Sequence, residues 1–328
     1  MSGHNTTEQA TPQPTAKMRL RLRRALSGKV QILLFLFSVT LINAAYADTY
    51  LVQLPRDNSA IAQSYYHDLL AELVNDENEI KTIERPVTQG RSLQLLDSGE
   101  LTVAWSGTSI VREKEFRPIR VPMYLGLLGV RVPVIRKNDV ARFRSITDEQ
   151  TLQDMVACQG DQWPDSDILE HNQYRVERVA LYESMFKMLQ AGRCDYFPRS
   201  IIEVHGELSD PDRSDLMAYE GLLLSYPFPM YYFMSYQQEA KASDLERKLY
   251  EYATSGKLLT FMKTHPTSRE TFPLTRFKDS TIFYLHNPDL PTDTPISDTA
   301  LWLMPGQATN EELQAQQLFM SPKVISVP

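Results

Sequence analysis

One stretch of the chain, Leu101 to Lys137, limits the possible folds most strongly. It opens with an apolar run, Leu101–Trp105, which lies between two glycines and is typical of a buried parallel strand. Small hydroxyl groups and open backbone N–H groups follow at Ser106–Ser109, and Arg112 comes next. A guanidinium beside such donors suits a carboxylate, because its paired donors match two oxygens. However, Arg112 lies within the charged sequence VREKEF and could instead occupy a solvated turn. Composition alone favours the solvated turn.

The residues before this stretch alternate between strand and helix patterns. TYLVQLP and EIKTIERP read as strands, and apolar residues recur every fourth position from Ser59 to Asn75, as in a helix: Ile61, Tyr65, Leu69 and Leu73. A second helix runs through Leu96 and ends at Gly99, which can adopt the left-handed backbone. Strand, helix, strand, helix, strand is the β-α-β-α-β beginning of a parallel sheet.

The N-terminal 47 residues read as a secretory signal. A basic run after Met18 precedes the apolar segment Val30–Ile42, whose 13 residues are fewer than the ~20 needed to span a membrane. Ala45-Tyr46-Ala47 is a cleavage site of the A-x-A type. We therefore expect a periplasmic protein that begins at Asp48, with either Met1 or Met18 as its start; an uncleaved signal anchor is the alternative.

The mature chain is strongly acidic. The signal segment holds six of the 34 Lys and Arg residues and one of the 41 Asp and Glu residues, so 28 basic and 40 acidic residues remain, a net charge of −12. This balance argues against a nucleic-acid partner. A mature length of 281 residues fits one or two domains.

The residues after Lys137 continue with strands and helices. VACQG, ending at Gly160, is a strand that precedes a helix at 165–170, and the free N–H groups of such a helix can receive an anion. Trp163 could form an aromatic wall there or pack under the loop. A further helix, Tyr182 to Gln190, precedes the sequence AGRCDYFPRSIIEV.

From about Thr49 to Thr264 the pattern resembles the extracellular solute-binding proteins of family 3, the amino-acid-type binding components of ABC importers. Thr108, Arg112 and the segment VPMY, ending at Tyr124, match the family's hydroxyl loop, carboxylate clamp and following segment. GRCDYF resembles its G-R-x-D strand, but the family's Asp for the ligand α-amino group falls on Ser200, next to Arg199. Glu203 or Glu207 could replace that carboxylate, although such a pair is usually one solvated helix face.

The resemblance implies an α/β fold of the type 2 periplasmic-binding-protein kind. Its two lobes would each hold a mainly parallel sheet flanked by helices, with hinge crossovers near 125–134 and 197–203. The expected parts are a signal segment (1–47), lobe 1 (48–128 and 201–268), lobe 2 (129–200), a proline-rich extension (269–305) and a mobile tail (306–328). Leu301–Pro305 should pack back on a lobe.

The resemblance also implies a set of ligand-binding residues between the lobes: Trp105, Thr108, Arg112, Tyr124, Gly160, Trp163, Arg199, Ser200 and Glu203. The family's sheet brings the strands of Cys158 and Cys194 close together, so these two cysteines, the only ones in the chain, could form a disulfide in an oxidising periplasm. Two separate buried thiols remain the alternative.

The implied function is capture of a small anionic or zwitterionic solute by hinge closure, for ABC-type import. A monomer without cofactor or metal would then work with an inner-membrane permease. A sensor that signals to a membrane receptor is a second possibility. A lyase or dehydratase using Glu203, Asp165 and Arg112 is a third, although the sequence contains none of HExxH, CxxC, GxSxG or GxxxxGK.

Overall fold

The computed structural model describes residues 49–53, 60–74, 78–83, 87, 89–303 and 305. The predicted signal peptide, the predicted N-terminus at Asp48 and the predicted tail (306–328) lie outside these residues. Asp48–Pro328 forms one compact unit. None of the helices in the described ranges has the length and apolar character needed to cross a membrane.

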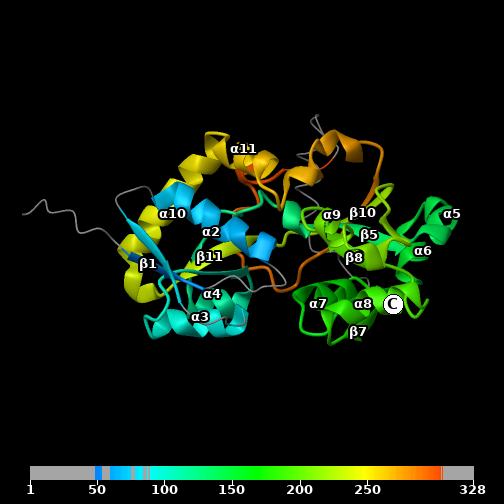
Figure 1. Cartoon of the computed structure of the whole chain (residues 1–328), viewed down its shortest axis with the longest axis horizontal. Coiled ribbons are helices and arrows are strands. Elements are labelled where there is room, and N and C mark those ends of the chain that lie inside the picture. The colour runs from blue at the N-terminus through cyan, green and yellow to red at the C-terminus, as the bar shows by residue number, and fades with distance from the viewer. Residues whose placement is uncertain are drawn as a thin grey trace, which may run out of the picture. The chain divides into compact units, whose positions relative to one another are not determined.

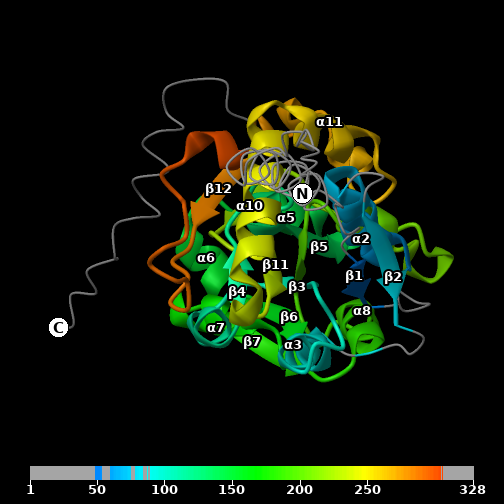
Figure 2. The same ribbon diagram turned by 90° about the vertical axis from the view of Figure 1, so that its left-hand side faces the viewer.

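The described residues of the first lobe form two small sheets and the helices α2, α3, α4, α10 and α11 (Figure 1). The strand β11 lies between β3 and β4 and is antiparallel to both, whereas β1 and β2 pair in parallel. Helix α10 packs on β4 and on α2 (Figure 2). The elements are β1 (Thr49–Val52), α2 (Ala60–Val74), β2 (Glu79–Thr82), α3 (Gln89–Asp97), β3 (Ala104–Gly107), α4 (Ile110–Glu115), β4 (Arg117–Ile119), β11 (Met230–Met234), α10 (Glu239–Thr254) and α11 (Lys257–Thr264).

The second lobe is built around β5, which pairs antiparallel with β8, β9 and β10, while β12 adds a parallel edge strand to β10. A separate parallel pair, β6 and β7, lies under α7 and α8. The elements are β5 (Val130–Arg136), α5 (Val140–Arg144), α6 (Glu149–Gln153), β6 (Val156–Gly160), α7 (Pro164–His171), β7 (Arg175–Val179), α8 (Tyr182–Gln190), β8 (Phe197–Ser200), α9 (Val204–Glu207), β9 (Leu216–Ala218), β10 (Leu222–Ser225) and β12 (Thr281–Tyr284).

The sheets are mixed rather than mainly parallel. Parallel pairing occurs where a helix connects the strands, as between β1 and β2 or β6 and β7. The predicted strand Leu101–Trp105 begins only at Ala104. Just before it, the N–H groups of Thr102 and Val103 donate to the carbonyl of Leu51 in β1. Residues 104–107 then pair antiparallel with β11.

The second crossover differs from the predicted one. After Ser200 the chain stays in the second lobe, since β9 and β10 both pair with β5, and it returns to the first lobe only between Ser225 and Met230. The two crossings, 124–130 and 225–230, touch at Gly129, where a Cβ would lie 1.9 Å from Tyr226 O. The predicted crossover near 197–203 is therefore wrong, and β9 and β10 belong to the second lobe instead of the first. The chain returns to the first lobe at the prolines after Ser225.

Residues 285–303 extend beyond β12. Leu301 is buried, and the N–H of Leu303 donates to Leu125 O at 2.8 Å. Leu301–Leu303, the first part of the predicted segment Leu301–Pro305, therefore packs back on the rest of the protein.

Candidate ligand site

A buried arginine near the end of β8 organises a polar cluster of two glutamates and an indole ring. The guanidinium of Arg199, which is only 5% exposed, donates to Glu203 at 3.0 Å and to Glu207 at 2.8 Å. Its planar group lies over the ring of Trp163, 5.0 Å from the centroid. Because an isolated buried cation is costly, these partners are what permit a charge at this position.

The local sequence explains why Trp163 reaches Arg199. Pro164 begins α7, so Trp163 is held in extended backbone at its start. A Cβ on Gly160 would lie 2.5 Å from the indole, and glycine therefore lets the ring lie against the end of β6. Four of the predicted residues are thus brought together: Gly160, Trp163, Arg199 and Glu203.

This cluster faces aromatic residues of the first lobe. Burial, followed by the charge of Glu203, raises the pKa of Tyr66, and a side-chain hydrogen bond joins Tyr66 to Tyr124. Tyr124 stacks on Tyr65 at 4.2 Å, and Trp105 stacks on Tyr66 at 5.3 Å. Glu203 is therefore close enough for its charge to act on Tyr66 and Tyr124, whereas Trp105 is 1% exposed and belongs to the aromatic core behind the tyrosines.

The two glutamates beside Arg199 titrate in opposite directions. Burial raises the pKa of Glu203, and Glu207 raises it further against the opposing effect of Arg199. The pKa of Glu207 is lowered, because Arg199 and its hydrogen bonds outweigh the effect of burial. Arg199 thus holds Glu207 ionised, and Glu203 is the less compensated carboxyl.

A second buried network was not predicted as a ligand-binding unit. Arg131, at the start of β5, bonds to Asp165 of α7 at 2.6 Å and to the hydroxyl of Tyr226 at 2.9 Å. Tyr226 also donates to Asp165. Arg131 stands out in the otherwise apolar sequence VRVPVI, which is the signal that could have found it.

Arg112 lies in a different environment. Its side chain donates to Gly107 O at 2.6 Å and is half-buried, and burial lowers its pKa although Asp289 acts in the opposite direction. Within the described part of the chain, Arg112 has no carboxylate within ion-pair distance, in contrast to Arg131 and Arg199. It is therefore a partly desolvated cation with donors to spare.

The remaining predicted residues are engaged locally. Thr108 donates to Glu113 at 2.5 Å, and Glu113 binds Arg120 at 2.7 Å. Ser200 is fully buried, and its hydroxyl accepts from Ile202 N. Arg112 and Arg199 share no bonding partner. The three residues considered for an enzyme also have different partners: Glu203 bonds to Arg199, Asp165 to Arg131, and Arg112 to Gly107.

Two fully buried polar side-chain atoms lie near the ends of β3 and β6. Ser106 Oγ of β3 and Gln159 Nε2 of β6 have no hydrogen-bond partner among the described residues. Such atoms carry an energetic cost that structures normally avoid. Gln159 was not singled out from the sequence; an amide at the end of the apolar strand VACQG is the signal for it.

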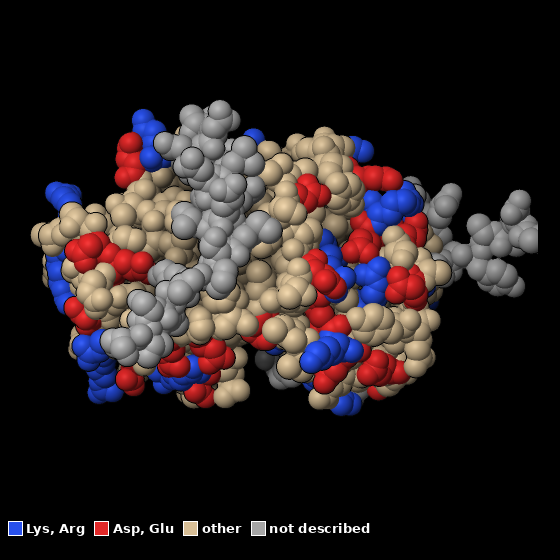
Figure 3. All heavy atoms as spheres, turned by 180° about the vertical axis from the view of Figure 1, so that it is seen from behind, with Lys and Arg blue, Asp and Glu red and all other residues tan. Residues whose placement is uncertain are grey.

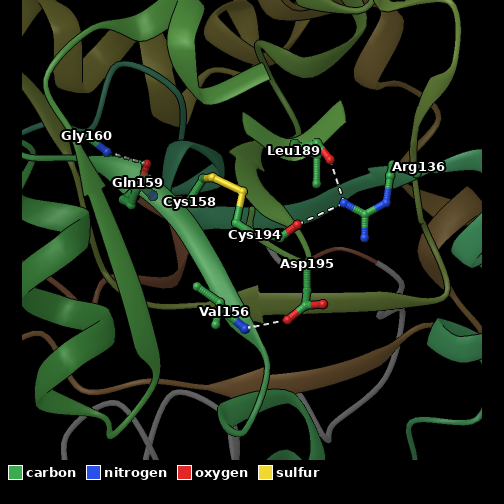
Figure 4. Close-up of a disulfide and its surroundings, with 8 residues drawn as sticks. All are labelled: Arg136, Val156, Cys158, Gln159, Gly160, Leu189, Cys194 and Asp195. Atoms are coloured by element: carbon green, nitrogen blue, oxygen red, sulfur yellow. Dashed lines mark hydrogen bonds between the residues drawn. A yellow bond between two sulfur atoms is a disulfide. The ribbon is translucent and has the colours of Figure 1, made fainter. Parts of the chain in front are cut away.

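The two cysteines are joined. Cys158 of β6 and Cys194, before β8, form a disulfide with Cα atoms 5.6 Å apart (Figure 4). Nearby, Arg136 donates to the carbonyl of Cys194 at 2.8 Å, and Asp195 accepts from Val156 N at 2.8 Å. The bridge therefore fixes β6, which ends at Gly160, to the segment that leads into Arg199.

The charged surface offers no one-sign patch on the face drawn in Figure 3, where acidic and basic side chains alternate. In the ranges that the structure covers, no three His, Cys, Asp or Glu residues are grouped so as to hold a metal ion.

No protein-family model matches the chain, and no curated protein matches it. Solved structures do. A probable amino-acid ABC transporter extracellular-binding protein from Bacillus subtilis is 14% identical with a TM-score of 0.55, over 68% of this chain and 99% of that one. The BvgS VFT2 domain from Bordetella pertussis, solved as a double mutant, is 14% identical with a TM-score of 0.52, over 70% and 96%.

A third structure, an arginine transport-system periplasmic binding protein from Legionella pneumophila, is 12% identical with a TM-score of 0.50, over 67% of this chain and 100% of that one. At these identities the likeness concerns the fold. It agrees with the two lobes and two crossings described above. The chain therefore has the two-lobed, type 2 periplasmic-binding-protein fold.

Proposed function

We propose that this protein captures a small carboxylate-bearing solute between its lobes and closes around it. The observation that carries this proposal is Arg112, a half-buried cation without an ion-pair partner among the described residues. A ligand carboxylate would pair with its free donors, and exclusion of water on closure would strengthen the pair. Differential contact with the closed state would drive the hinge.

The second lobe would supply the other contacts. Trp163 offers an aromatic face, and Glu203 is the less compensated carboxyl of the Arg199 cluster. Because Ser200 stands at the family's carboxylate position, the ligand need not carry an α-amino group; where it does, Glu203 would bind it. We place the protein in the periplasm as a monomer that delivers its solute to an inner-membrane ABC permease.

A thermal-shift panel of amino acids, organic acids and small peptides tests the proposal. A ligand at about 100 times its dissociation constant adds about 2.7 kcal/mol to the free energy of unfolding. We expect at least one carboxylate compound to raise the melting temperature and its matched amide to fail. A panel in which carboxylates and amides stabilise equally would refute the role of Arg112.

A periplasmic sensor is the second candidate, because one matching fold is a BvgS domain. The two functions differ in the partner. Cross-linking in cells with and without the ligand, followed by mass spectrometry, should recover a permease if the protein serves import and a signalling receptor if it serves sensing.

A further inference from the structure

The segment Leu285–Leu303, which we call the brace, leaves the second lobe beside α7. Asn172, the C-cap residue of α7, donates to His286 O at 2.7 Å and accepts from His286 N at 3.0 Å. Asn172 is 5% exposed, so this reciprocal pair is shielded from water. The brace is also covalently continuous with β12, the edge strand of the second-lobe sheet. Its beginning is therefore fixed to the second lobe.

The brace then contacts the second crossing and the first lobe. Asn287 donates to Pro227 O at 2.9 Å, within the crossing that returns the chain to the first lobe. Ile110 N of α4 donates to the carbonyl of Asp289 at 3.2 Å, and Arg120 lies 3.4 Å from Asp293. One continuous segment thus touches both lobes.

The far end of the brace docks on the first crossing. Leu303 N donates to Leu125 O at 2.8 Å, and the ring of Trp302 lies so close to Gly126 that a Cβ there would be 2.2 Å from it. The indole N–H of Trp302 donates to Pro295 O at 2.9 Å, which folds the brace on itself. Both crossings are therefore covered by residues of the same segment.

We propose that the brace is a third connection between the lobes that restricts hinge motion. Two crossings alone form a hinge about which lobes can rotate. A segment bonded to α7, to α4 and to both crossings must shift or detach when the lobes rotate, so its contacts set the range of opening. This property goes beyond solute binding and is independent of which solute binds.

Interlobe distances test the proposal without any ligand. Spin labels on the exposed positions Asp97→Cys of α3 and Lys187→Cys of α8 report the separation by double electron–electron resonance; the native cysteines are paired with each other. A chain ending at Leu285 keeps β12 and loses the rest of the brace, and a chain ending at Pro305 is its matched control. We expect the control to match the full chain and the shorter chain to show a broader distribution that extends to longer distances.

Point variants decide the matter if the shorter chain does not fold. Trp302→Ala releases the brace from Gly126, and Asn172→Ala removes its reciprocal pair with His286. Each should broaden the distance distribution, and the pair together more than either alone. Distributions that superimpose on the wild type in folded variants, judged by circular dichroism, would overturn the proposal. Because no ligand enters the measurement, this result is independent of the thermal-shift panel.

Discussion

At the scale of single residues, Arg112 and Arg199 show two ways of placing a cation in a partly dry environment. Arg199 is neutralised by two glutamates of its own chain, so it holds structure together. Among the described residues, the Arg112 guanidinium donates to the carbonyl of Gly107 and has no carboxylate within ion-pair distance, so its positive charge remains available. This difference predicts that a ligand anion would bind Arg112 and not Arg199.

Replacing Arg112 tests this choice. Arg112→Ala should weaken binding of the best carboxylate ligand by about 2–5 kcal/mol, because the ligand anion loses its paired donors. Arg112→Lys should recover little, since one ammonium cannot reproduce the guanidinium fork. Calorimetry measures both, and Arg144→Ala, a change at an exposed arginine of the second lobe, is the control. Binding by Arg112→Ala within twofold of wild type would make Arg112 a surface charge.

The pair Glu203 and Glu207 predicts opposite pH dependences. Burial raises the folded-state pKa of Glu203, so its contribution to stability is greatest at acid pH and is lost as pH rises from the unfolded value towards the folded one. Arg199 lowers the folded-state pKa of Glu207 despite burial, so its contribution is present above the unfolded value and is lost as pH falls through the folded one.

Urea unfolding at about pH 4 and about pH 7 measures this difference. Relative to wild type, Glu207→Gln should lose more free energy of unfolding at the higher pH than at the lower. Glu203→Gln should show the opposite trend, with a smaller loss of unfolding free energy at the higher pH. Parallel pH profiles for the two variants would contradict the assignment.

Some of these residues could be predicted and others could not. Gly160, Trp163, Arg199 and Glu203 follow from a strand that ends before a helix and from the match to a known pattern, and the structure brings them together. Thr108 was predicted to contact the ligand, but its hydroxyl donates to Glu113 of α4, a partner that the prediction did not include. Arg131 was missed because its partner, Asp165, is distant in sequence.

At the scale of elements, helix α8 shows that apolar periodicity can predict the bounds of a helix. Its bounds, Tyr182–Gln190, agree with the prediction, because the apolar face is regular and Gly192 adopts the left-handed backbone (φ 70°) after it. Strand pairing was less predictable, since β9 and β10 join β5 through contacts that no local pattern encodes. The second crossover was misplaced for that reason.

The disulfide should stabilise the second lobe measurably. Its sequence separation of 36 residues corresponds to about 4 kcal/mol by the chain-entropy model. Unfolding in urea with and without reductant should show a loss of this order, and the double variant Cys158→Ser, Cys194→Ser should be insensitive to reductant. Two free thiols titrated in the denatured, unreduced protein would show that the bridge does not form.

Alanine substitutions at two glycines with left-handed backbone distinguish the cost of an unfavourable backbone conformation from the cost of a steric clash. Gly192→Ala meets no atom within 4 Å, so it should cost only the about 1–2 kcal/mol of an unfavourable backbone. Gly126→Ala has a similar φ of 78° but also collides with Trp302, so it should cost more. Chemical unfolding compares the two. Equal losses would mean that Trp302 is not held against Gly126.

At the scale of the whole molecule, the proposed capture of a solute between two lobes predicts binding without turnover. Among the described residues, Glu203 and Glu207 are bonded to Arg199, and Asp165 is bonded to Arg131 and to the hydroxyl of Tyr226. We expect the best ligand to be recovered unchanged after long incubation with the protein, by mass spectrometry. Product in stoichiometric excess over protein would establish an enzyme.

The strand pairing also determines when each lobe can form. The first-lobe sheet needs β3 near residue 104 and β11 near residue 230, and the second-lobe sheet needs β5 near residue 130 and β12 at Thr281–Tyr284. The two sets interleave along the chain, so neither sheet is complete until the other is largely present. Such distant pairings slow folding, because long loops must close before their contacts form. The chain should therefore stay unfolded until most of it has been synthesised, a state compatible with the periplasmic location proposed above.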